Sequence, residues 1–158
     1  MYTDGLRQVE PWTIKSGPQT IHFEGELLGE ATSEDFAKRQ GRQRWHEVRI
    51  YVTTAGDYIV EKCGMSTIAG EVTRSTVHQS STARGAIECL QSQDSDGVFY
   101  MTYVARAATQ QAALLNDPLR EAYYEQRLTS TSCSSSTCSS CSPRNDSPST
   151  VSRGRSPR

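Results

Sequence analysis

The stretch RWHEVRIYVTTAGDYIVEKCG, residues 44–64, constrains the fold more than any other part of this sequence. It alternates between apolar and polar side chains, turns at a glycine and then alternates again. A period of two places successive side chains on opposite faces of a strand, so the pattern predicts an antiparallel β-hairpin. On the first strand the apolar side chains share one face, and we expect that face to be buried: Val48, Ile50 and Val52.

The register of this hairpin is open at the level of sequence. A two-residue loop would pair Val52 with Ile59, whereas a longer loop would pair Val52 with Tyr58. A shift of one residue moves every side chain of a strand to the other face of the sheet. The sequence therefore leaves the inner face of the second strand undetermined.

Two further segments predict strands. Residues 19–28, QTIHFEGELL, alternate, and Gly25 within them marks a bulge or a close neighbouring backbone. Residues 66–78 predict an irregular third β segment, broken at Gly70. The polar residues 29–44 allow either a short helical turn capped by Ser33 or a flexible loop.

Helices are predicted in the second half of the chain. Residues 83–90 carry an apolar stripe with helical spacing behind two N-cap candidates, Ser80 and Ser81. Residues 98–104, VFYMTYV, fit either a strand or the start of a helix. The spacing of the apolar residues that follow makes the chain helical by about residue 102.

A last helix is predicted to start with Asp117 as its cap and Pro118 at its first position, where the missing N–H costs nothing. Strands grouped before helices favour an α+β fold. We expect an antiparallel sheet of three to four strands, with two or three C-terminal helices on one face. No internal repeat is present.

The composition divides the chain into three parts. Residues 1–17 predict a loose lead-in from which Trp12 can pack back onto the body. Residues 18–128 predict one α+β domain. From Thr129 onward the only large apolar side chain is Val151, so we expect residues 129–158 to form a disordered tail.

Charge follows the same division. Before Thr129 there are 13 Lys and Arg against 17 Asp and Glu, a balance of −4. In the tail four arginines face only Asp146, a balance of +3. A basic tail on an acidic body suits salt-sensitive contact with nucleic acid or another polyanion. The alternative is that the arginines only keep a Ser-rich tail in solution.

No segment has the ~18 consecutive apolar residues of a membrane span, and the N-terminus has no apolar core resembling a signal peptide. The sequence therefore predicts a cytoplasmic protein without a membrane partner. Cys63 and Cys89 are expected to be reduced, small and buried side chains.

The tail cysteines Cys133, Cys138 and Cys141 have spacing that resembles part of a zinc site. A fourth ligand would have to come from the body, from Cys89 or His78, and the surrounding residues are nearly all serine. We therefore predict no metal site here, while zinc binding by the tail cysteines stays the open alternative. Glycine patterns that cradle phosphates are absent, so no cofactor is expected.

One alternative function is a small metal-dependent or hydrolytic enzyme. His22 shares a strand face with Glu24 and Glu26, and a histidine beside carboxylates can act as a general base or bind a metal. His78 could join them through the fold. Neighbours two apart on a strand also describe an ordinary solvated face.

The opposite face of the first hairpin strand carries the residues that we predict to bind a partner. Aromatic and arginine side chains alternate there, and a basic run precedes them. Aromatic rings stack on bases and guanidinium groups neutralise phosphates, while the same combination is enriched at protein–protein interfaces. The alternative is that this face lies beneath the helices. The predicted partner-binding residues are Lys38, Arg39, Arg42, Arg44, Trp45, Arg49 and Tyr51.

Three runs, FEGELLGEATS, RWHEVRIYVTTAGDYIVEKCGMS and GVFYMTYVARAA, resemble small uncharacterised proteins carried on bacterial plasmids and other mobile elements. The resemblance covers residues 22–113 at most and brings no known catalytic residues. It implies an accessory protein of a mobile element. We therefore predict a non-enzymatic accessory or regulatory binding module that contacts a protein or a nucleic acid. The choice between these two partners and the oligomeric state stay open.

Overall fold

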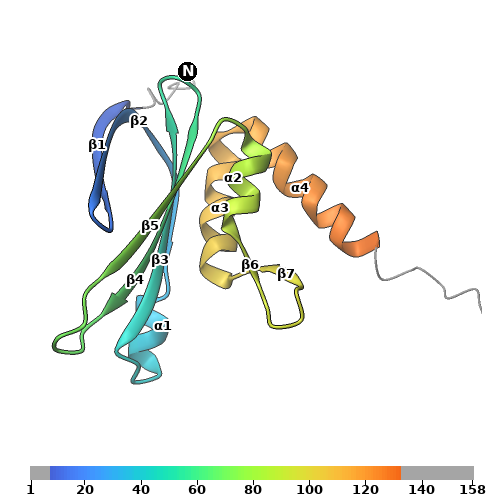
Figure 1. Ribbon diagram of the computed structural model, residues 1–158. Helices are drawn as coiled ribbons and strands as arrows, with labels where there is room; N and C mark the ends of the chain where they lie inside the picture. The colour runs from blue at the N-terminus through green and yellow to red at the C-terminus, as the bar shows by residue number, and fades with distance from the viewer. Residues whose placement is uncertain (1–7, 133–158) are drawn as a thin grey trace, which may run out of the picture.

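The computed structural model describes residues 8–132, and the side chains of residues 8–128. A five-stranded antiparallel sheet forms its centre, and each strand pairs with the next one along the chain. Figure 1 shows this sheet beside the helices. The strands are β1 (Glu10–Ser16), β2 (Gln19–Thr32), β3 (Arg44–Thr53), β4 (Tyr58–Ser66) and β5 (Arg74–Ser80).

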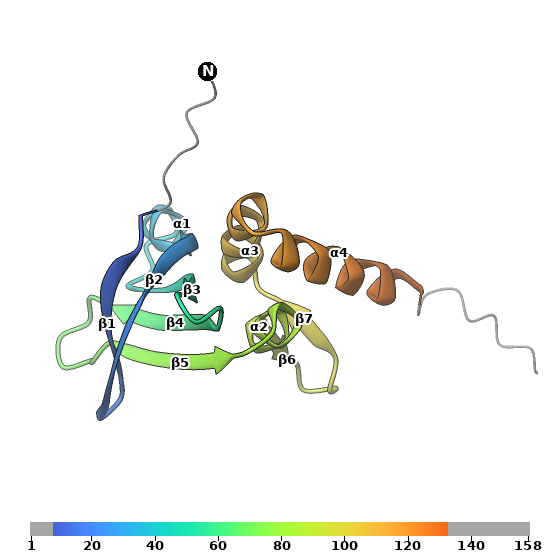
Figure 2. The same ribbon diagram turned by 90° about the horizontal axis from the view of Figure 1, so that it is seen from above.

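The sheet is strongly curled, as the view from above shows (Figure 2). The hairpin of β1 and β2 bends over one face until β1 contacts β5, the strand at the other edge. The backbone N–H of Val77 on β5 donates a hydrogen bond to Ser16 Oγ on β1 at 3.3 Å. The sheet therefore has a concave face, which looks toward β1, and a convex face.

Helices cover the convex face. Within the described part of the chain the helices are α1 (Glu34–Arg39), α2 (Ala83–Leu90), α3 (Tyr103–Leu115) and α4 (Asp117–Ser132). α3 packs on β2 and β3, α2 packs on β4 and β5, and α4 rests on both helices. The short α1 lies between β2 and β3 at one end of the sheet (Figure 1). A small second hairpin joins α2 to α3 through β6 (Gln91–Gln93) and β7 (Phe99–Met101).

The main hydrophobic core lies between the convex face and the helices. Val48 and Ile50 are 5% and 0% exposed there, and Val52 packs against the same core while partly buried. The predicted inner face of the first hairpin strand is thus confirmed. Full burial of each such side chain contributes about 1.5–3 kcal/mol to stability. The buried partners include Leu28, Tyr58, Val60, Ile87, Leu90, Ala108, Ala112 and Leu119.

A second, smaller core lies on the concave face under the β1–β2 hairpin. Ile14, Tyr51 and Ile59 are buried there, and they pack against Trp12 and Phe23. At this end the central strands are therefore buried on both faces. Towards the other end of β3 and β4 the concave face is open.

The predicted β-hairpin of residues 44–64 is confirmed as β3 and β4. Its register pairs Val52 with Tyr58, which is the longer-loop alternative. This register places Tyr58 and Val60 in the main core, and Ile59 and Glu61 on the concave face.

Residues 10–16 correct the prediction of a loose lead-in. They form β1, which pairs with β2 so that Trp12 lies opposite Phe23. The alternation of Trp12 and Ile14 across Thr13 supplies the apolar face that makes this strand stable. The sheet therefore has five strands rather than three to four, while the α+β class is confirmed.

For the predicted β segment over residues 66–78 the break at Gly70 is confirmed, whereas the start of the strand is corrected. β4 continues to Ser66, a loop follows, and β5 begins only at Arg74. Gly70 lies in that loop with a φ of 85°. A left-handed residue cannot continue a strand ladder, so the chain turns there before β5 begins.

The first two helix starts differ in detail from the sequence prediction. Residues 29–44 were predicted to form either a short helical turn capped by Ser33 or a flexible loop. The helix α1 does begin after Ser33, but the Ser33 side chain makes no cap hydrogen bond. For α2 the cap is Thr82 rather than Ser80 or Ser81, because Thr82 Oγ1 accepts from the N–H of Gly85 at 3.1 Å.

The last helix also starts one residue away from the prediction. Asn116 rather than Asp117 is its cap, because Asn116 Oδ1 accepts from the N–H of Leu119 at 3.0 Å. α4 then continues to Ser132, past the predicted end of the domain at residue 128. The predicted tail beyond it, with Cys133, Cys138 and Cys141, lies outside the described residues.

β2 contains a β-bulge, where its pairing with β3 shifts between Leu27 and Gly29. The extra residue reverses the alternation, so the side chains after the bulge change face. Before it Leu27 faces the concave side, whereas after it Ala31 packs into the main core and Glu30 points to the concave side. At Gly25 there is no bulge. A Cβ there would overlap Val52 O, so this glycine marks a close neighbouring backbone.

Gly29 lies against α3 with no room for a side chain. A Cβ would overlap the carbonyl of Ala108 and would lie 2.8 Å from the amide nitrogen of Ala112. We expect Gly29→Ala to reduce the free energy of unfolding by roughly 1–3 kcal/mol, the usual effect of overpacking. Urea denaturation followed by circular dichroism measures this.

Gly64→Ala on β4 is the matched control, because its Cβ would meet nothing closer than Arg74 O at 3.9 Å. We expect this control to leave the free energy of unfolding nearly unchanged. Equal losses in the two variants would contradict a close contact between β2 and α3.

Candidate functional site

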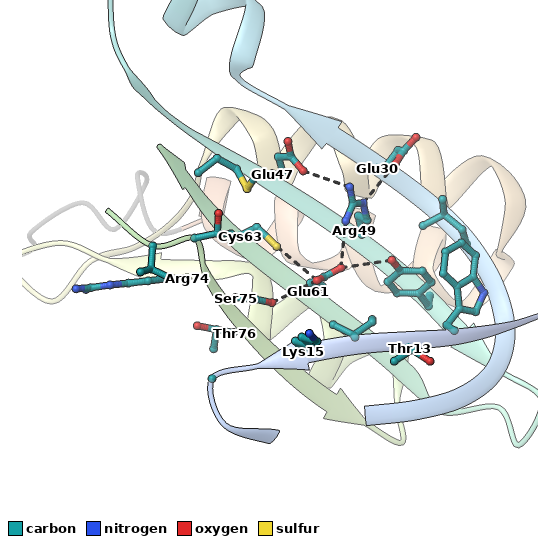
Figure 3. A pocket seen from close by; sticks show the side chains of 18 residues that line it. Thr13, Lys15, Glu30, Glu47, Arg49, Glu61, Cys63, Arg74, Ser75 and Thr76 are labelled. Carbon is teal, nitrogen blue, oxygen red and sulfur yellow. Dashed lines mark hydrogen bonds and ion pairs between the residues drawn. The ribbon is translucent and has the colours of Figure 1, made fainter. Parts of the chain in front are cut away.

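The open part of the concave face forms a cavity of about 1090 Å³, which we call the cup. All five strands and the β4–β5 loop contribute to its lining (Figure 3). One end is apolar, with Trp12, Ile14 and Leu27, and the centre is polar, with Arg49 and Glu61. A concave site of this size with a few converging polar groups is the usual form of a small-molecule site.

Arg49 lies at the centre of the cup between three carboxylates. The sheet register places Arg49 directly opposite Glu30 on β2 and Glu61 on β4. Its guanidinium nitrogens lie 3.5 Å from Glu30 Oε2, 3.5 Å from Glu61 Oε2 and 3.2 Å from Glu47 Oε2 (Figure 3). One cation therefore serves three anions.

Glu61 is the buried member of this group, with only 7% of its surface exposed. It accepts hydrogen bonds from the hydroxyl of Tyr51 at 3.4 Å and the hydroxyl of Ser75 at 3.3 Å. The thiol of Cys63 also donates to it at 3.4 Å. These donors and Arg49 hold the carboxylate in place, as buried charges require.

Tyr51 joins the polar centre to the apolar end of the cup. Its ring packs against Trp12 and Phe23, with centroid separations of 4.8 and 5.4 Å. The Trp12 ring is fixed in turn, because its Nε1–H donates to Gly25 O at 3.2 Å. Burial and the neighbouring Glu61 carboxylate raise the pKa of Tyr51, so its hydroxyl stays protonated and donates to Glu61.

The thiol of Cys63 in the cup is not activated as a nucleophile. Burial raises the pKa of the Cys63 thiol, so this side chain stays protonated near neutral pH. No histidine is among the described residues that line the cup. Nucleophilic catalysis by a thiolate with a histidine base has no support in this arrangement.

The structure divides the predicted partner-binding residues into two groups. Arg49 and Tyr51 belong to the cup, and Tyr51 is only 2% exposed because the β1–β2 hairpin covers it. This face of β3 does not lie beneath the helices. Trp45 is half-buried near the end of β3, where its Nε1–H donates to Glu47 Oε1 at 3.1 Å.

The basic run forms the other group, and all four of its side chains are exposed. Lys38 and Arg39 end α1, Arg42 lies in the loop that follows, and Arg44 begins β3. The expectation that these residues form one surface with Arg49 and Tyr51 is therefore corrected, because the cup and the basic run lie apart. Their role in binding a partner stays a prediction.

The residues of the alternative enzyme hypothesis lie elsewhere. His22 is exposed on β2, where its Nδ1 lies 3.0 Å from Thr13 Oγ1. Neither His22 nor Glu24 nor Glu26 lines the cup, and His78 lies on β5, separated from β2 by two strands. Within residues 8–132 no group of three or more His, Cys, Asp or Glu side chains is placed to hold a metal ion.

Sequence reasoning missed several cup residues, namely Trp12, Glu30, Glu61, Cys63 and Ser75. A signal existed for Glu61, because the longer-loop register places it opposite Arg49. Glu30 could not be predicted from the alternation of β2, because the bulge reverses this alternation and turns the Glu30 side chain toward Arg49.

Comparisons with known proteins found no matching family model, curated protein or solved structure. The resemblance to proteins of plasmids and mobile elements therefore stays a prediction. None of the described helices is long and apolar enough to cross a membrane.

Removal of Arg49 should destabilise the protein, because Glu61 would stay buried without a cation. We expect Arg49→Met to lower the free energy of unfolding by roughly 1–3 kcal/mol. This is less than for a fully buried pair, because the Arg49 side chain is 38% exposed. The double variant Arg49→Met/Glu61→Gln should recover part of the loss in urea denaturation.

Arg84→Met is the control, since Arg84 forms only an exposed pair with Glu88. Its removal should lower the free energy of unfolding by less than about 1 kcal/mol. A double variant no more stable than Arg49→Met alone would contradict the assigned pairing of Arg49 with Glu61.

Cys63 should resist alkylation in the folded protein. Its raised pKa leaves little thiolate even at pH 8.5, and only 8% of the residue is exposed. Peptide mapping after iodoacetamide treatment should show slow modification of Cys63 in buffer and fast modification in 8 M urea. Equal rates in the two conditions would contradict the burial of this thiol.

Proposed function

We propose that the protein is a non-enzymatic binding module that holds a small organic molecule in the cup. The ligand has an apolar body and a cationic head group, such as an amine or an amidine. The observation that carries this proposal is the buried Glu61 in the wall of a cavity of about 1090 Å³, within a group of three carboxylates that share Arg49.

The charged centre of the cup has no evident structural purpose. Removal of charges from water costs several kcal/mol per ion, and apolar residues of similar size stabilise a protein at least as well. The convex face shows that this sheet is stabilised by ordinary apolar packing. Charged groups gathered at the wall of a cavity instead favour recognition of a ligand.

The charge balance of the centre favours a cation. Glu30, Glu47 and Glu61 share one guanidinium, which leaves two negative charges around Arg49. Lys15 and Arg74 also line the cup and are exposed, as Glu30 is, but neither forms an ion pair with the three carboxylates among the described residues. The guanidinium of Arg74 points away from Arg49 in Figure 3, and its charge acts on Glu71.

The neighbouring end of the cup suits an apolar body. Trp12, Ile14 and Leu27 line it, and the Tyr51 ring connects this surface to Glu61. Ile14 and Tyr51 are buried, but Trp12 and Leu27 are only half-buried, so a flat or aliphatic ligand can cover their accessible parts while its head reaches the carboxylates. An accessory or regulatory role in a mobile element, which the resemblance implies, is part of this proposal.

Three isosteric fragments test the preference for a cationic head: benzamidine, benzamide and benzoate. They share an aromatic ring and differ in having a positive, a neutral or a negative group. Saturation-transfer NMR on the intact protein should show the strongest signal for benzamidine. Stronger binding of benzoate would overturn the cationic head, and no binding of any fragment would overturn the cup as a ligand site.

Two variants locate the bound fragment. Ser75→Trp and Met65→Trp place an indole into the cup from β5 and β4, and both should abolish the benzamidine signal. Glu121→Trp adds the same ring at an exposed position on α4 and should leave the signal intact. A signal that survives in both cup variants, with folding verified by circular dichroism, would place the fragment elsewhere.

A further inference from the structure

A second surface, independent of the cup, is formed by α1, the loop that follows it and the start of β3. We infer that this surface, which we call the α1 surface, binds single-stranded nucleic acid. Its recognition groups are the guanidinium groups of Arg39 and Arg42 and the aromatic ring of Phe36. The sequence left the choice between a protein and a nucleic acid open, and the side-chain arrangement favours the second.

Two of the four cations in the basic run are already neutralised within the protein. Lys38 lies 2.7 Å from Glu34 on α1. Arg44 forms a two-pronged ion pair with Glu71, which holds the pKa of that carboxyl near 2 through hydrogen bonding. Because a carboxylate of the protein already neutralises each of these cations, both attract a negatively charged partner less strongly.

Arg39 and Arg42 differ from these two residues. Both are exposed, and within residues 8–132 neither forms an ion pair or a side-chain hydrogen bond. The nearest unpaired acid along the chain is Asp35, in the first turn of α1. Asp35 precedes Arg39 by four residues and so lies on the same side of α1, but the two side chains form no ion pair. Arg42 lies in the loop after the helix.

The backbone that carries these arginines is fixed. Gly41 adopts a φ of 64°, and its N–H donates to Lys38 O at 3.1 Å. The N–H of Arg42 donates to Ala37 O at 2.8 Å, which completes the pair of hydrogen bonds of a Schellman motif. Arg42 is therefore held at a defined place beside the end of α1 before any partner binds.

An exposed aromatic ring lies next to the two arginines. Phe36 is 56% exposed and precedes Arg39 by three residues, which places the two side chains on one face of α1. Phe36, Arg42, Trp45 and Ile68 line a hollow of about 520 Å³. A nucleobase can stack on such a ring while neighbouring guanidinium groups contact the adjacent phosphates.

This combination favours a single strand over the other polyanions. An acidic peptide would use the arginines but would leave the exposed ring without a flat partner. A duplex keeps its bases stacked on one another, so they are not available to Phe36. The tail adds four arginines and one aspartate to the same chain, which increases the attraction of any phosphate backbone.

Fluorescence anisotropy of a labelled 20-nucleotide oligothymidylate, titrated with the full chain at several salt concentrations, tests the inference. Arg39→Gln/Arg42→Gln should weaken binding about tenfold or more at low salt. It should also reduce the salt slope by about 1.4, because each phosphate contact on a single strand contributes about 0.7. Phe36→Ala should weaken binding about tenfold with an unchanged slope, because stacking releases no counterion.

Arg84→Gln/Arg106→Gln is the control for the loss of two positive charges, with two exposed arginines removed from α2 and α3, of which Arg84 pairs with Glu88. It should bind the oligonucleotide like the unaltered protein, because the tail arginines are the same in both double variants. Equal losses in the two double variants, or none in either, would overturn the α1 surface as the site. Binding of a labelled poly-glutamate peptide, but not of the oligonucleotide, would assign the surface to an acidic protein instead.

Discussion

The β-bulge in β2 is the constraint on which both faces of the sheet depend. Without the extra residue at Leu28, the side chains after it would exchange faces. Glu30 would then point toward the helices, and Ala31 would leave the main core. The bulge also bends its strand and increases the local twist. This bend fits the path of the β1–β2 hairpin, which crosses the concave face and reaches β5 (Figure 2).

The convex face of the sheet forms the main hydrophobic core, whereas the concave face carries the charged groups of the cup. The convex face packs against small residues of α3, chiefly Ala108 and Ala112, and their size lets the helix approach the backbone of Gly29. This close packing buries the apolar face of the hairpin. The concave face does not have to form the main core, so it can carry Arg49 and the three carboxylates. Charges buried in an apolar core would lose their hydration, which is costly unless they are paired.

The sequence predicts the parts of this fold that depend on local periodicity. The hairpin of residues 44–64 and its Val48 face followed from alternation, because one strand face must be buried. The first strand was missed, since Trp12 and Ile14 form too short a pattern to stand out in a polar segment. The cup was missed because it depends on the pairing of distant residues. Glu30, Arg49 and Ser75 meet only through the register of four strands and one bulge.

Strand β3 explains why the predicted partner-binding surface separates into two. Odd-numbered positions of β3 share one face, and they include Trp45, Arg49 and Tyr51. Because the sheet is curled, different parts of this face meet different neighbours. The β1–β2 hairpin covers the Tyr51 end, whereas α1 and its arginines lie beside the Trp45 end. Glu47 lies between these ends and contacts both Trp45 Nε1 and the Arg49 guanidinium. One strand therefore supplies side chains both to the polar centre of the cup and to the exposed basic surface beside α1, and the curvature of the sheet separates these two sites.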